Sequence, residues 1–452
     1  MELNKIKNLL SDLSKQIYLV GGAVRDYFLA KELVDIDLAV QGPTKKIAQE
    51  LAARVEGSLV TLDEERAMYR IVTEEVTYDL SPLAKNEIKF DLAQRDFTIN
   101  ALALDLSKLE SPQEDLIDPY NGLTDLEEGK LRIVSKKSFI DDPLRILRMV
   151  RFKAQFGFDI VTTTKELAQK WAAKISAVAN ERIKDELLKI CSYKGSARNL
   201  ALLAKLGIFS SLLPQADKLT EMGRCQYHQE DIWTHSIAAV EEVENLLTNS
   251  YWQTKIDKVN LPLLKLAALL HDYGKLYTAE EIEGVVHFYG HQKVGADKLS
   301  YILKDLSFSN QELEYIVHLV RYHMRPFSLY KADNLTFKGK YNFFKTGAEF
   351  IEDICLLSAA DKLSAAKLNN RQNRIEDYLK FLKDLITTKK EWNKRSKKRL
   401  ISGNDLIEKF GLEEGPKIGE ILAKINKLQA KGEINSRQEA IVYLENNLAS
   451  QL

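Results

Sequence analysis

Strand-like segments alternate with turns and helical segments in the first third of the chain. Five short runs, bounded mostly by turn residues, have the composition of strands: IYLVGG, VDIDLAV, GSLVTLD, YRIVT and VTYDLS. From DDPLRILRMVRF onward, the sequence has a helical pattern over almost its whole remaining length. The pattern therefore predicts an α+β protein, in which an α/β head precedes a long all-α part.

Composition narrows the class of protein without naming a partner. A chain of 452 residues is expected to form about two to four domains. The 65 lysines and arginines balance the 65 aspartates and glutamates, so no overall basic field indicates nucleic acid, although a local basic groove is sufficient for binding it. Three widely spaced cysteines favour a reducing cytoplasm. No run of about eighteen apolar residues predicts a membrane span, so we expect a cytoplasmic protein.

A double glycine follows the first predicted strand. In YLVGGAVRDYF, Gly21 and Gly22 form a tight turn ahead of a helix, whose free N–H groups suit a phosphate. Arg25 can add a charge-assisted contact. Glycine turns at strand–helix junctions are more often structural, so this motif alone is a weak signal.

Two aspartates one residue apart strengthen the interpretation. On a strand, Asp35 and Asp37 point to the same face. Neighbouring carboxylates repel unless cations hold them, and two Mg²⁺ would activate a 3′-hydroxyl and steady a leaving pyrophosphate. Asp79, in VTYDLS, is a candidate third carboxylate from a neighbouring strand. The alternative is an exposed strand edge with solvated acids.

The segment QRDFTINALALD places Arg95, Asp96 and Asn100 in an otherwise apolar run. These side chains are suited to ribose and triphosphate, or Asp96 simply caps a helix entry. In IDDPLRILRMVRF, we expect Asp142 and Arg145 on one helix edge, where a surface salt bridge is the simpler interpretation. The functional interpretation is that the carboxylate and the guanidinium together read the edge of a nucleotide base.

All seven histidines lie between His228 and His323. In this region and shortly after it, five helical segments supply imidazoles and carboxylates, the donors that a divalent transition metal prefers. The candidate ligands are His235, His271, Asp272, His291, His323 and Asp361.

A basic stretch, TTKKEWNKRSKKRL, follows the histidine region and predicts an RNA contact, because its cations can track phosphates and its tryptophan offers a stacking face. A solvated helix face is equally compatible with it. The candidate RNA-binding residues are Lys389, Lys390, Trp392, Lys394, Arg395, Lys397, Lys398 and Arg399.

Five motifs in this order resemble the class II tRNA nucleotidyltransferase and bacterial poly(A) polymerase family. They are LVGGAVRD, DIDLAV, RDFTINALALD, IDPYNGLTDLEEGKLRIV and DDPLRILRMVRFKAQFGF. The resemblance extends through NERIKDELLKI and returns in the tail, SGNDLIEKFGLEEGPKIGEIL. In the histidine region, HDYGK with its flanking residues resembles the HD phosphohydrolase domain.

The resemblance implies a nucleotidyltransferase (polymerase beta-like) head over residues 1–140 and a helical neck over residues 141–215. An HD domain would follow over residues 216–385, and a helical tRNA-binding tail over residues 386–452. Partners would be tRNA and CTP or ATP. Mg²⁺ would be held by Asp35 and Asp37. The remaining residues that would surround the nucleotide are Gly21, Gly22 and Arg25 near the triphosphate, Arg95 and Asp96 at the sugar and phosphates, Asp142 and Arg145 as an amino-acid template, and Arg148 and Arg151 lining the pocket.

The resemblance also implies a use for the histidine region. His235, His271, Asp272 and Asp361 would be the core ligands of the HD domain, and His291 and His323 would support a second metal. Such a domain would hydrolyse 2′,3′-cyclic phosphates or phosphomonoesters. A domain that keeps its ligands but serves as a scaffold for RNA is the alternative.

Three departures from the family pattern refine the expected activity. Gln94 replaces an arginine, and Asp141 replaces a glutamate. The flexible loop that full CCA-adding members carry ahead of RDFTINA is missing, because YDLSPLAKNEIKFDLAQRDFTINA runs almost directly to that motif. In the family, this loss accompanies enzymes that add only the two cytidines and leave the terminal A to a separate A-adding enzyme. The alternatives within the family are full CCA addition, A addition and poly(A) synthesis. The alternatives outside it are an HD phosphohydrolase with an RNA-binding head and a non-catalytic RNA-binding protein.

Overall fold

The computed structural model describes residues 3–10, 16–108, 110–222, 231–332, 335–368, 375–396, 400–431 and 433–448. The chain divides into two compact units. The first comprises residues 1–217 and 305–307, and the second comprises residues 218–304 and 308–452. Among the described helices, none is long and apolar enough to cross a membrane.

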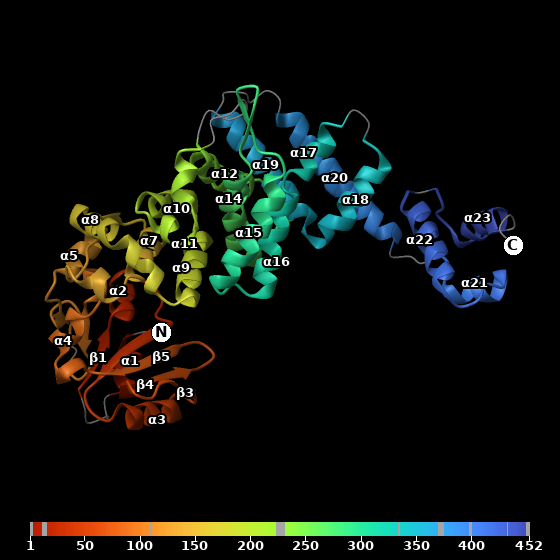
Figure 1. Ribbon diagram of the computed structural model, residues 1–452. Coiled ribbons are helices and arrows are strands. Elements are labelled where there is room, and N and C mark those ends of the chain that lie inside the picture. Colours follow the sequence, from red (N-terminus) through yellow and green to blue (C-terminus); the bar gives the residue numbers. More distant parts are fainter. Residues whose placement is uncertain are drawn as a thin grey trace. The chain divides into compact units, whose positions relative to one another are not determined.

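The first unit contains a mixed seven-stranded sheet with the order β3-β4-β5-β2-β1-β6-β7 (Figure 1). The five strands predicted from the sequence are confirmed. The strands are β1 (Ile17–Val20), β2 (Asp35–Val40), β3 (Ser58–Asp63), β4 (Met68–Val72), β5 (Thr77–Pro82), β6 (Ala103–Asp105) and β7 (Leu116–Ile117). Strand β2 pairs antiparallel with β1 and parallel with β5. Because β2 therefore lies inside the sheet, the strand-edge alternative for its two aspartates is wrong.

Apolar side chains cover both faces of this sheet. On β1, Leu19 belongs to a large core cluster, whereas Tyr18 and Val20 belong to a smaller cluster on the opposite face, as the two-residue period of a strand requires. The large cluster also takes the apolar side chains of the flanking helices Leu3–Leu10 and Thr44–Arg54. The helices of the head are α1 (Leu3–Leu10), α2 (Gly22–Phe28), α3 (Thr44–Arg54), α4 (Ile88–Ala93) and α5 (Gly122–Glu127).

Short helices complete the first unit, with two two-residue strands, β8 (Lys130–Leu131) and β9 (Asp159–Ile160), that pair in parallel. The helices are α6 (Ser138–Asp141), α7 (Arg145–Phe156), α8 (Thr162–Trp171), α9 (Asn180–Ser192), α10 (Ser196–Lys205) and α11 (Ile208–Leu212). One helix edge carrying both Asp142 and Arg145 was expected, but α6 ends before Asp142 and α7 begins at Arg145. Asp142 is extended, with φ −144° and ψ 99°, because a residue that precedes proline, here Pro143, avoids the helical conformation.

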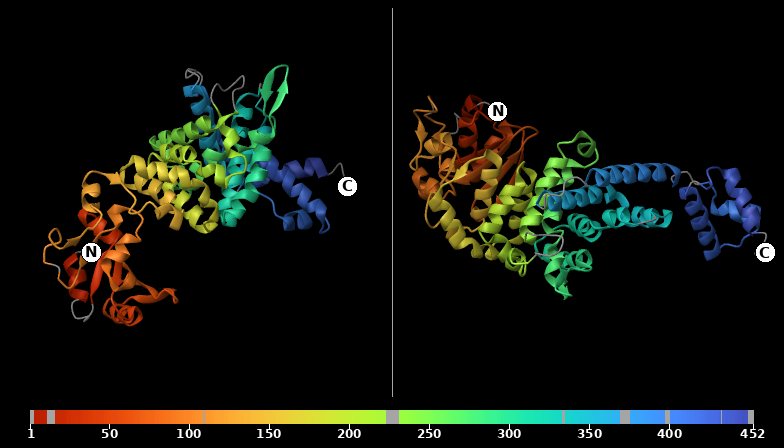
Figure 2. Two further views of the ribbon diagram at one scale, coloured as in Figure 1. Left: turned by 60° about the vertical axis from the view of Figure 1, so that its left-hand side comes forward. Right: turned by 90° about the horizontal axis from the view of Figure 1, so that it is seen from above.

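The described residues of the second unit form helices and one hairpin. Its larger part contains α12 (Ile232–Leu246), α13 (Ser250–Gln253), α14 (Leu261–Leu270), α15 (His291–Asp305), α16 (Asn310–Tyr322), α17 (Arg325–Tyr330), α18 (Phe337–Gly347), α19 (Ile351–Leu368) and α20 (Ile375–Ser396). The hairpin of β10 (Glu280–Ile282) and β11 (Val285–His287) stands out from the helices in Figure 2. The sequence pattern, which predicted helices throughout this part, missed it.

Three helices form the C-terminal part, which has an apolar core of its own. They are α21 (Gly403–Phe410), α22 (Pro416–Lys431) and α23 (Arg437–Leu448). A capping box begins α21, because the Ser402 hydroxyl accepts from the Asp405 N–H while the Asp405 carboxylate accepts from the Ser402 N–H. Leucines and isoleucines of the tail make up most of this small core.

Candidate active site of the head and candidate metal centre

The two expected carboxylates of β2 meet a third on β5. Asp37 lies directly opposite Asp79 in the parallel pairing, so both side chains project from the same face of the sheet. Asp35 lies opposite Thr77 on that face and is exposed. The Asp79 carboxylate also accepts two hydrogen bonds from the guanidinium of Arg70, each 2.7 Å long. The structure thus brings the three predicted aspartates together and adds an arginine that the sequence did not single out.

The glycine turn lies against Asp37. Gly21 has φ +65°, and a Cβ at this position would lie 2.8 Å from the Nη1 atom of Arg95. A Cβ at Gly22 would lie 3.4 Å from Oδ2 of Asp37. Burial raises the pKa of Asp37; Arg95 and the Gly22 N–H oppose this rise, and the Asp79 carboxylate adds to it. A buried carboxylate beside a second one is an environment that a divalent cation would stabilise.

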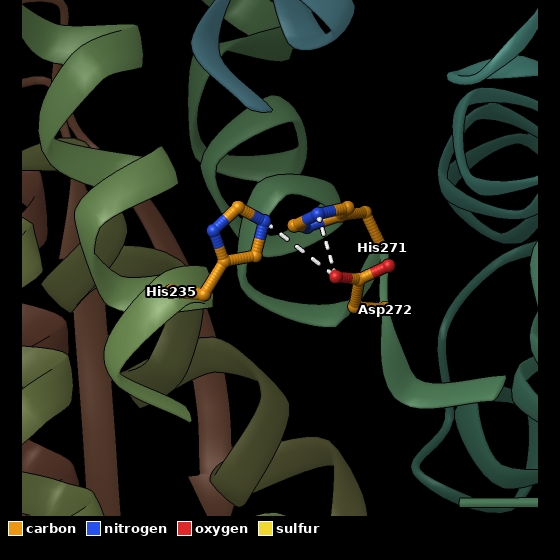
Figure 3. A group of neighbouring side chains, drawn as sticks. All are labelled: His235, His271 and Asp272. Atoms are coloured by element: carbon orange, nitrogen blue, oxygen red, sulfur yellow. Dashed lines mark ion pairs between the residues drawn. The ribbon is translucent and has the colours of Figure 1, made fainter. Parts of the chain in front are cut away.

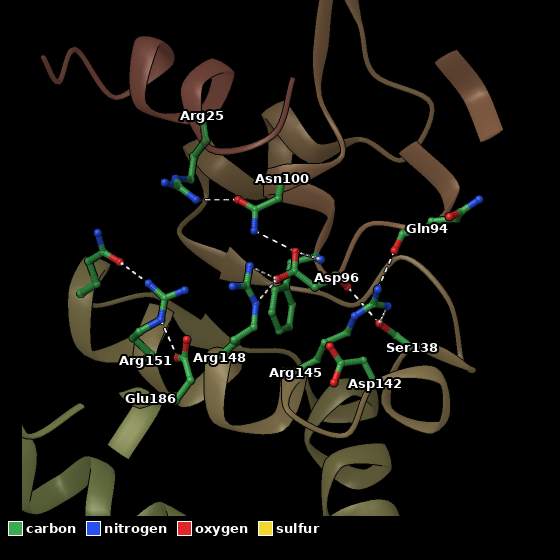
Figure 4. A network of polar contacts seen from close by, with 12 residues as sticks. Arg25, Gln94, Asp96, Asn100, Ser138, Asp142, Arg145, Arg148, Arg151 and Glu186 are labelled. Carbon is green, nitrogen blue, oxygen red and sulfur yellow. Dashed lines mark hydrogen bonds and ion pairs between the residues drawn. The ribbon is translucent and has the colours of Figure 1, made fainter. Parts of the chain in front are cut away.

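A chain of hydrogen bonds connects α2 with α7 (Figure 4). The Nη1 atom of Arg25 donates to the Asn100 side-chain oxygen at 2.6 Å, and the Asn100 amide donates to Asp96 at 2.9 Å. Arg148 then donates to the other Asp96 oxygen through Nε at 2.8 Å. Arg25 is also held by the carboxylate of Asp26. Four residues predicted to contact the nucleotide therefore form one network.

Asp96 is the centre of this network. Burial alone would raise its pKa, but the Arg148 guanidinium and the hydrogen bonds from Asn100, Arg148 and the Phe97 N–H together hold the pKa below its usual value. The carboxylate is therefore charged at neutral pH and fixes the direction in which Arg148 points. The helix-cap alternative is too simple, because Asp96 accepts from side chains as well as from the backbone.

In the described part of the chain, the surface salt bridge between Asp142 and Arg145, the simpler interpretation of the sequence, is not formed. Arg145 donates to the Ser138 hydroxyl at 2.9 Å and to the backbone oxygen of Gln94 at 2.6 Å (Figure 4). Asp142 instead pairs with Arg182 of α9 at 3.0 Å. The break in the helix before Arg145 explains the difference, because the two side chains are not on one helix. Each is held by a separate partner.

Arg151 is held on the same helix as Arg148. Its Nε donates to the buried Glu186 carboxylate of α9 at 2.7 Å, and its guanidinium lies 4.3 Å from the centre of the Phe152 ring. Arg148 lies near the same ring, 5.3 Å from its centre. Helix α9 therefore holds Arg151 through Glu186, as it holds Asp142 through Arg182, whereas Arg148 is held by Asp96.

Six candidate metal ligands of the second unit converge, and all are buried. His235 Nε2 lies 3.5 Å from Asp272 Oδ2 (Figure 3). The same atom lies 3.2 Å from Asp361 Oδ1. His271 Nε2 lies 3.4 Å from Asp272 Oδ2, and His291 Nε2 lies 3.2 Å from Asp272 Oδ1. The ligand atoms of His323, His271 and Asp361 all lie within 4.8 Å of one another. The same holds for the ligand atoms of His323, Asp272 and His291.

The histidine rings are oriented by the backbone. The Nδ1 atoms of His271, His291 and His323 lie 2.7–2.9 Å from the carbonyl oxygens three residues earlier, at Ala268, Phe288 and Val320. A proton on each Nδ1 leaves the Nε2 lone pairs directed at carboxylate oxygens. A cation bound between them would remove the repulsion between these electron-rich atoms. Burial lowers the pKa of His323 to about 3, which keeps this imidazole neutral. The donor set fits a divalent transition metal.

Part of the expected RNA-binding stretch has another role. Lys389 is buried, and its ammonium group donates to the Ala348 carbonyl at 2.7 Å and lies 3.4 Å from Glu352. The prediction that Lys389 contacts RNA is therefore wrong, whereas Lys390 is exposed. The side chains of the other predicted contacts lie outside the described residues: Trp392, Lys394, Arg395, Lys397, Lys398 and Arg399.

Comparison with known proteins identifies the family. Residues 17–132 match the poly A polymerase head domain, residues 157–219 the probable RNA and SrmB-binding site of polymerase A, and residues 278–444 a putative domain 2 of tRNA nucleotidyltransferases. The A-adding tRNA nucleotidyltransferase of Deinococcus radiodurans is 30% identical over 434 residues, which cover 94% of each chain. This chain belongs to the tRNA nucleotidyltransferase family. It is therefore an enzyme that transfers nucleotides to the 3′ end of tRNA.

Members with different products are about equally similar to this tRNA nucleotidyltransferase. The CC-adding enzyme of Thermus thermophilus is also 30% identical, over 95% of this chain and 93% of its own. Among solved structures, the complex of a CCA-adding enzyme with CTP has a TM-score of 0.69 at 22% identity and covers 100% of this chain and 95% of its own. The Thermotoga maritima CCA-adding enzyme complexed with tRNA has the same TM-score at 23% identity, with the same coverage. These structural likenesses support the α+β fold.

Proposed function

We propose that this tRNA nucleotidyltransferase adds the two cytidines of the CCA end from CTP and leaves the terminal A to a separate enzyme. The observation that supports this most directly is the short connection between β5 and Arg95. It consists of a one-turn helix (Ala84–Asn86) and α4, and so leaves no room for a long flexible loop. Overall identity does not separate the activities, because A-adding and CC-adding relatives are equally similar.

The residues of the head are suited to bind a nucleoside triphosphate and the tRNA end. Gly21 and Gly22 would bring the backbone close to the triphosphate, and Arg25 and Arg95 would neutralise its charge. Asp35 and Asp37 would hold Mg²⁺, which when bound would favour the ionised 3′-hydroxyl and neutralise charge on the leaving group. The 3′-hydroxyl would attack the α-phosphate, the bond to the β-phosphate would break, and pyrophosphate would leave.

Asp79 would serve mainly to place Arg70, because both of its carboxylate oxygens already accept from that guanidinium. Its charge beside Asp37 would still strengthen the cation site. This role differs from direct coordination, and an Asp79→Asn variant would keep partial activity if Arg70 remains in place.

Asp142 and Arg145 would select the base. With Arg182 holding the carboxylate, and Ser138 with the Gln94 carbonyl holding the guanidinium, both groups would be fixed before the nucleotide arrives. A fixed carboxylate accepts from an exocyclic amino group, and a fixed guanidinium donates to ring acceptors. Cytosine offers both. Arg148 and Arg151 would line the same pocket, held by Asp96 and Glu186.

The assay that tests this proposal uses three tRNA transcripts, which end at the discriminator base, after one C, and after CC. Each is given CTP alone, ATP alone, or both, with Mg²⁺. We expect two cytidines on the first transcript, one on the second and no addition to the third. Addition of A to the CC end would contradict the proposal and indicate full CCA or A addition.

A second activity is favoured by the six buried ligands of the second unit. We propose that they bind a divalent transition metal and that this HD-like centre hydrolyses 2′,3′-cyclic phosphates or phosphomonoesters at tRNA ends. An Asp35→Ala variant should lose nucleotide addition and keep the hydrolysis, and a His271→Ala variant should show the reverse. Metal content, measured by mass spectrometry, should fall only in the second variant. Absence of hydrolysis in both the wild type and the Asp35→Ala variant would favour the scaffold alternative.

A further inference from the structure

Two lysines lie near the ring of one tyrosine in the second unit, and a third lies near one of these lysines. Tyr251 lies on α13, and its ring has the ammonium groups of Lys255 and Lys383 at 5.4 Å and 5.1 Å from its centre. Lys255 follows α13, whereas Lys383 and Lys390 lie seven residues, or about two turns, apart on the same side of α20. Lys390 is near enough to Lys255 for the two ammonium charges to affect each other.

This arrangement places like charges together. The neighbouring Lys390 ammonium lowers the pKa of Lys255, a shift that the nearby Glu352 carboxylate opposes only as a smaller effect. The Glu352 carboxylate also lies 3.4 Å from the ammonium group of the buried Lys389. Asp384 is the other acid close to Tyr251. Two neighbouring ammonium groups cost stability unless an anion joins them, since like charges repel.

The ring beneath the lysines is anchored. The hydroxyl oxygen of Tyr251 is buried, and the ring makes an edge contact with that of Trp252, which is almost completely buried. Lys255 and Lys383 therefore rest on a fixed aromatic surface, while Lys390 is exposed to solvent. The cluster is open to a ligand on one side and rigid on the other.

We propose that Tyr251, Lys255, Lys383 and Lys390 form a binding site for a backbone phosphate of tRNA. The site rests on the tRNA-directed function of the family, but it is separate from the nucleotide pocket of the head. A phosphodiester satisfies the donors of several ammonium groups at once, and it removes the repulsion between Lys255 and Lys390. The site replaces the buried Lys389 as the RNA contact of this helix.

The test measures tRNA binding by the full chain as a function of salt concentration. Lys255→Gln and Lys390→Gln are compared with Lys298→Gln, a matched control in which an exposed lysine lies 5.0 Å from the centre of the Tyr277 ring. We expect each cluster variant to weaken binding several-fold and to reduce the slope of log affinity against log salt by about one. The control should keep the wild-type slope. In nucleotide addition, the KM for tRNA should rise in the two cluster variants, whereas Lys298→Gln should keep the wild-type KM and kcat.

Thermal unfolding without RNA gives an independent readout. Because the two ammonium groups repel, Lys390→Gln should unfold at a higher temperature than the wild type, whereas loss of a purely structural lysine would lower that temperature. An unchanged salt slope in both cluster variants would overturn the proposal. So would a site that responds only to free anion, seen as stabilisation of the wild type by inorganic phosphate with unchanged tRNA slopes. A wild-type chain that binds tRNA but adds no nucleotide would contradict the proposed function. The salt slopes of the cluster variants would still decide whether the lysines bind a tRNA phosphate.

Discussion

Asp96 accepts hydrogen bonds from Asn100, Arg148 and the backbone, and its charge holds Arg148 in place. An Asp96→Asn variant removes that charge and leaves a guanidinium without its ion-pair partner. We expect the free energy of unfolding to fall by about 2 kcal/mol at pH 7, the usual cost of breaking a buried charged hydrogen bond. Urea denaturation measures this difference.

The pH dependence of the same variant has a definite sign. Because the folded state lowers the pKa of Asp96, its stabilisation is present above the unfolded pKa of about 3.9 and is lost as the pH falls through the folded pKa. The difference between wild type and variant should stay constant from pH 7 to pH 5 and shrink below about pH 4. A difference that grows on acidification would contradict the assignment.

Asp353 on α19 titrates in the opposite direction. Burial raises its pKa to about 6, although its carboxylate accepts from the Tyr315 hydroxyl at 2.7 Å. Because the pKa is raised, the contribution of this carboxyl to the free energy of unfolding is fully present below the unfolded pKa of about 3.9. It is lost as the pH rises through about 6. The unfolding temperature of the Asp353→Asn variant, minus that of the wild type, should therefore increase between pH 4.5 and pH 7.5. A constant difference would mean that Asp353 does not titrate there.

Single residues show what sequence reasoning can and cannot reach. The Asp-x-Asp pair was predictable because strand periodicity places both aspartates on one face. The ligand set around Asp272 was predictable from its donor types and from the resemblance to the HD domain. Arg70 was not, because its contact with Asp79 depends on the antiparallel pairing of β4 with β5. Lys389 was misjudged, because a basic run is normally solvated and the contact that buries it comes from a segment 41 residues away.

At the scale of elements, α9 supports one member of the proposed base-reading pair, Asp142, and the pocket arginine Arg151. Its Arg182 holds Asp142, and its Glu186 holds Arg151. The break at Pro143 makes this support necessary, because Asp142 and Arg145 no longer share a helix. The motif NERIKDELLKI contains both residues, and their spacing of four on one helix face was a signal that could have indicated a joint role.

An Arg182→Ala variant tests the role of α9. Arg182 is more than half exposed, so its ion pair with Asp142 should contribute less than about 1 kcal/mol to stability. We expect unfolding to change little, while the preference for CTP over UTP and ATP falls because Asp142 is released. Lys189→Ala, an exposed lysine on the same helix, is the control and should keep the preference. An unchanged preference in Arg182→Ala would show that Asp142 does not need this partner.

At the scale of the whole chain, the α/β head and the helical remainder were predictable from hydrophobic periodicity, since strand and helix periods alternate in the head and the helical period dominates after it. The β10–β11 hairpin was not, because two three-residue strands carry too little pattern. The domain boundaries predicted from motifs stay predictions. The two compact units divide near residue 217, so the predicted head and neck fall in the same unit.

The central claim is that the β2 aspartates carry out nucleotide transfer. The direct measurement is incorporation of labelled CTP into a tRNA transcript by the full chain and by the Asp35→Asn and Asp37→Asn variants. The control is Asp63→Asn, at the end of β3, with unfolding temperatures as a check on folding. We predict that each β2 variant loses at least about a hundredfold in rate while the control keeps wild-type activity. Near wild-type incorporation by a folded Asp37→Asn variant would contradict this account of the active site.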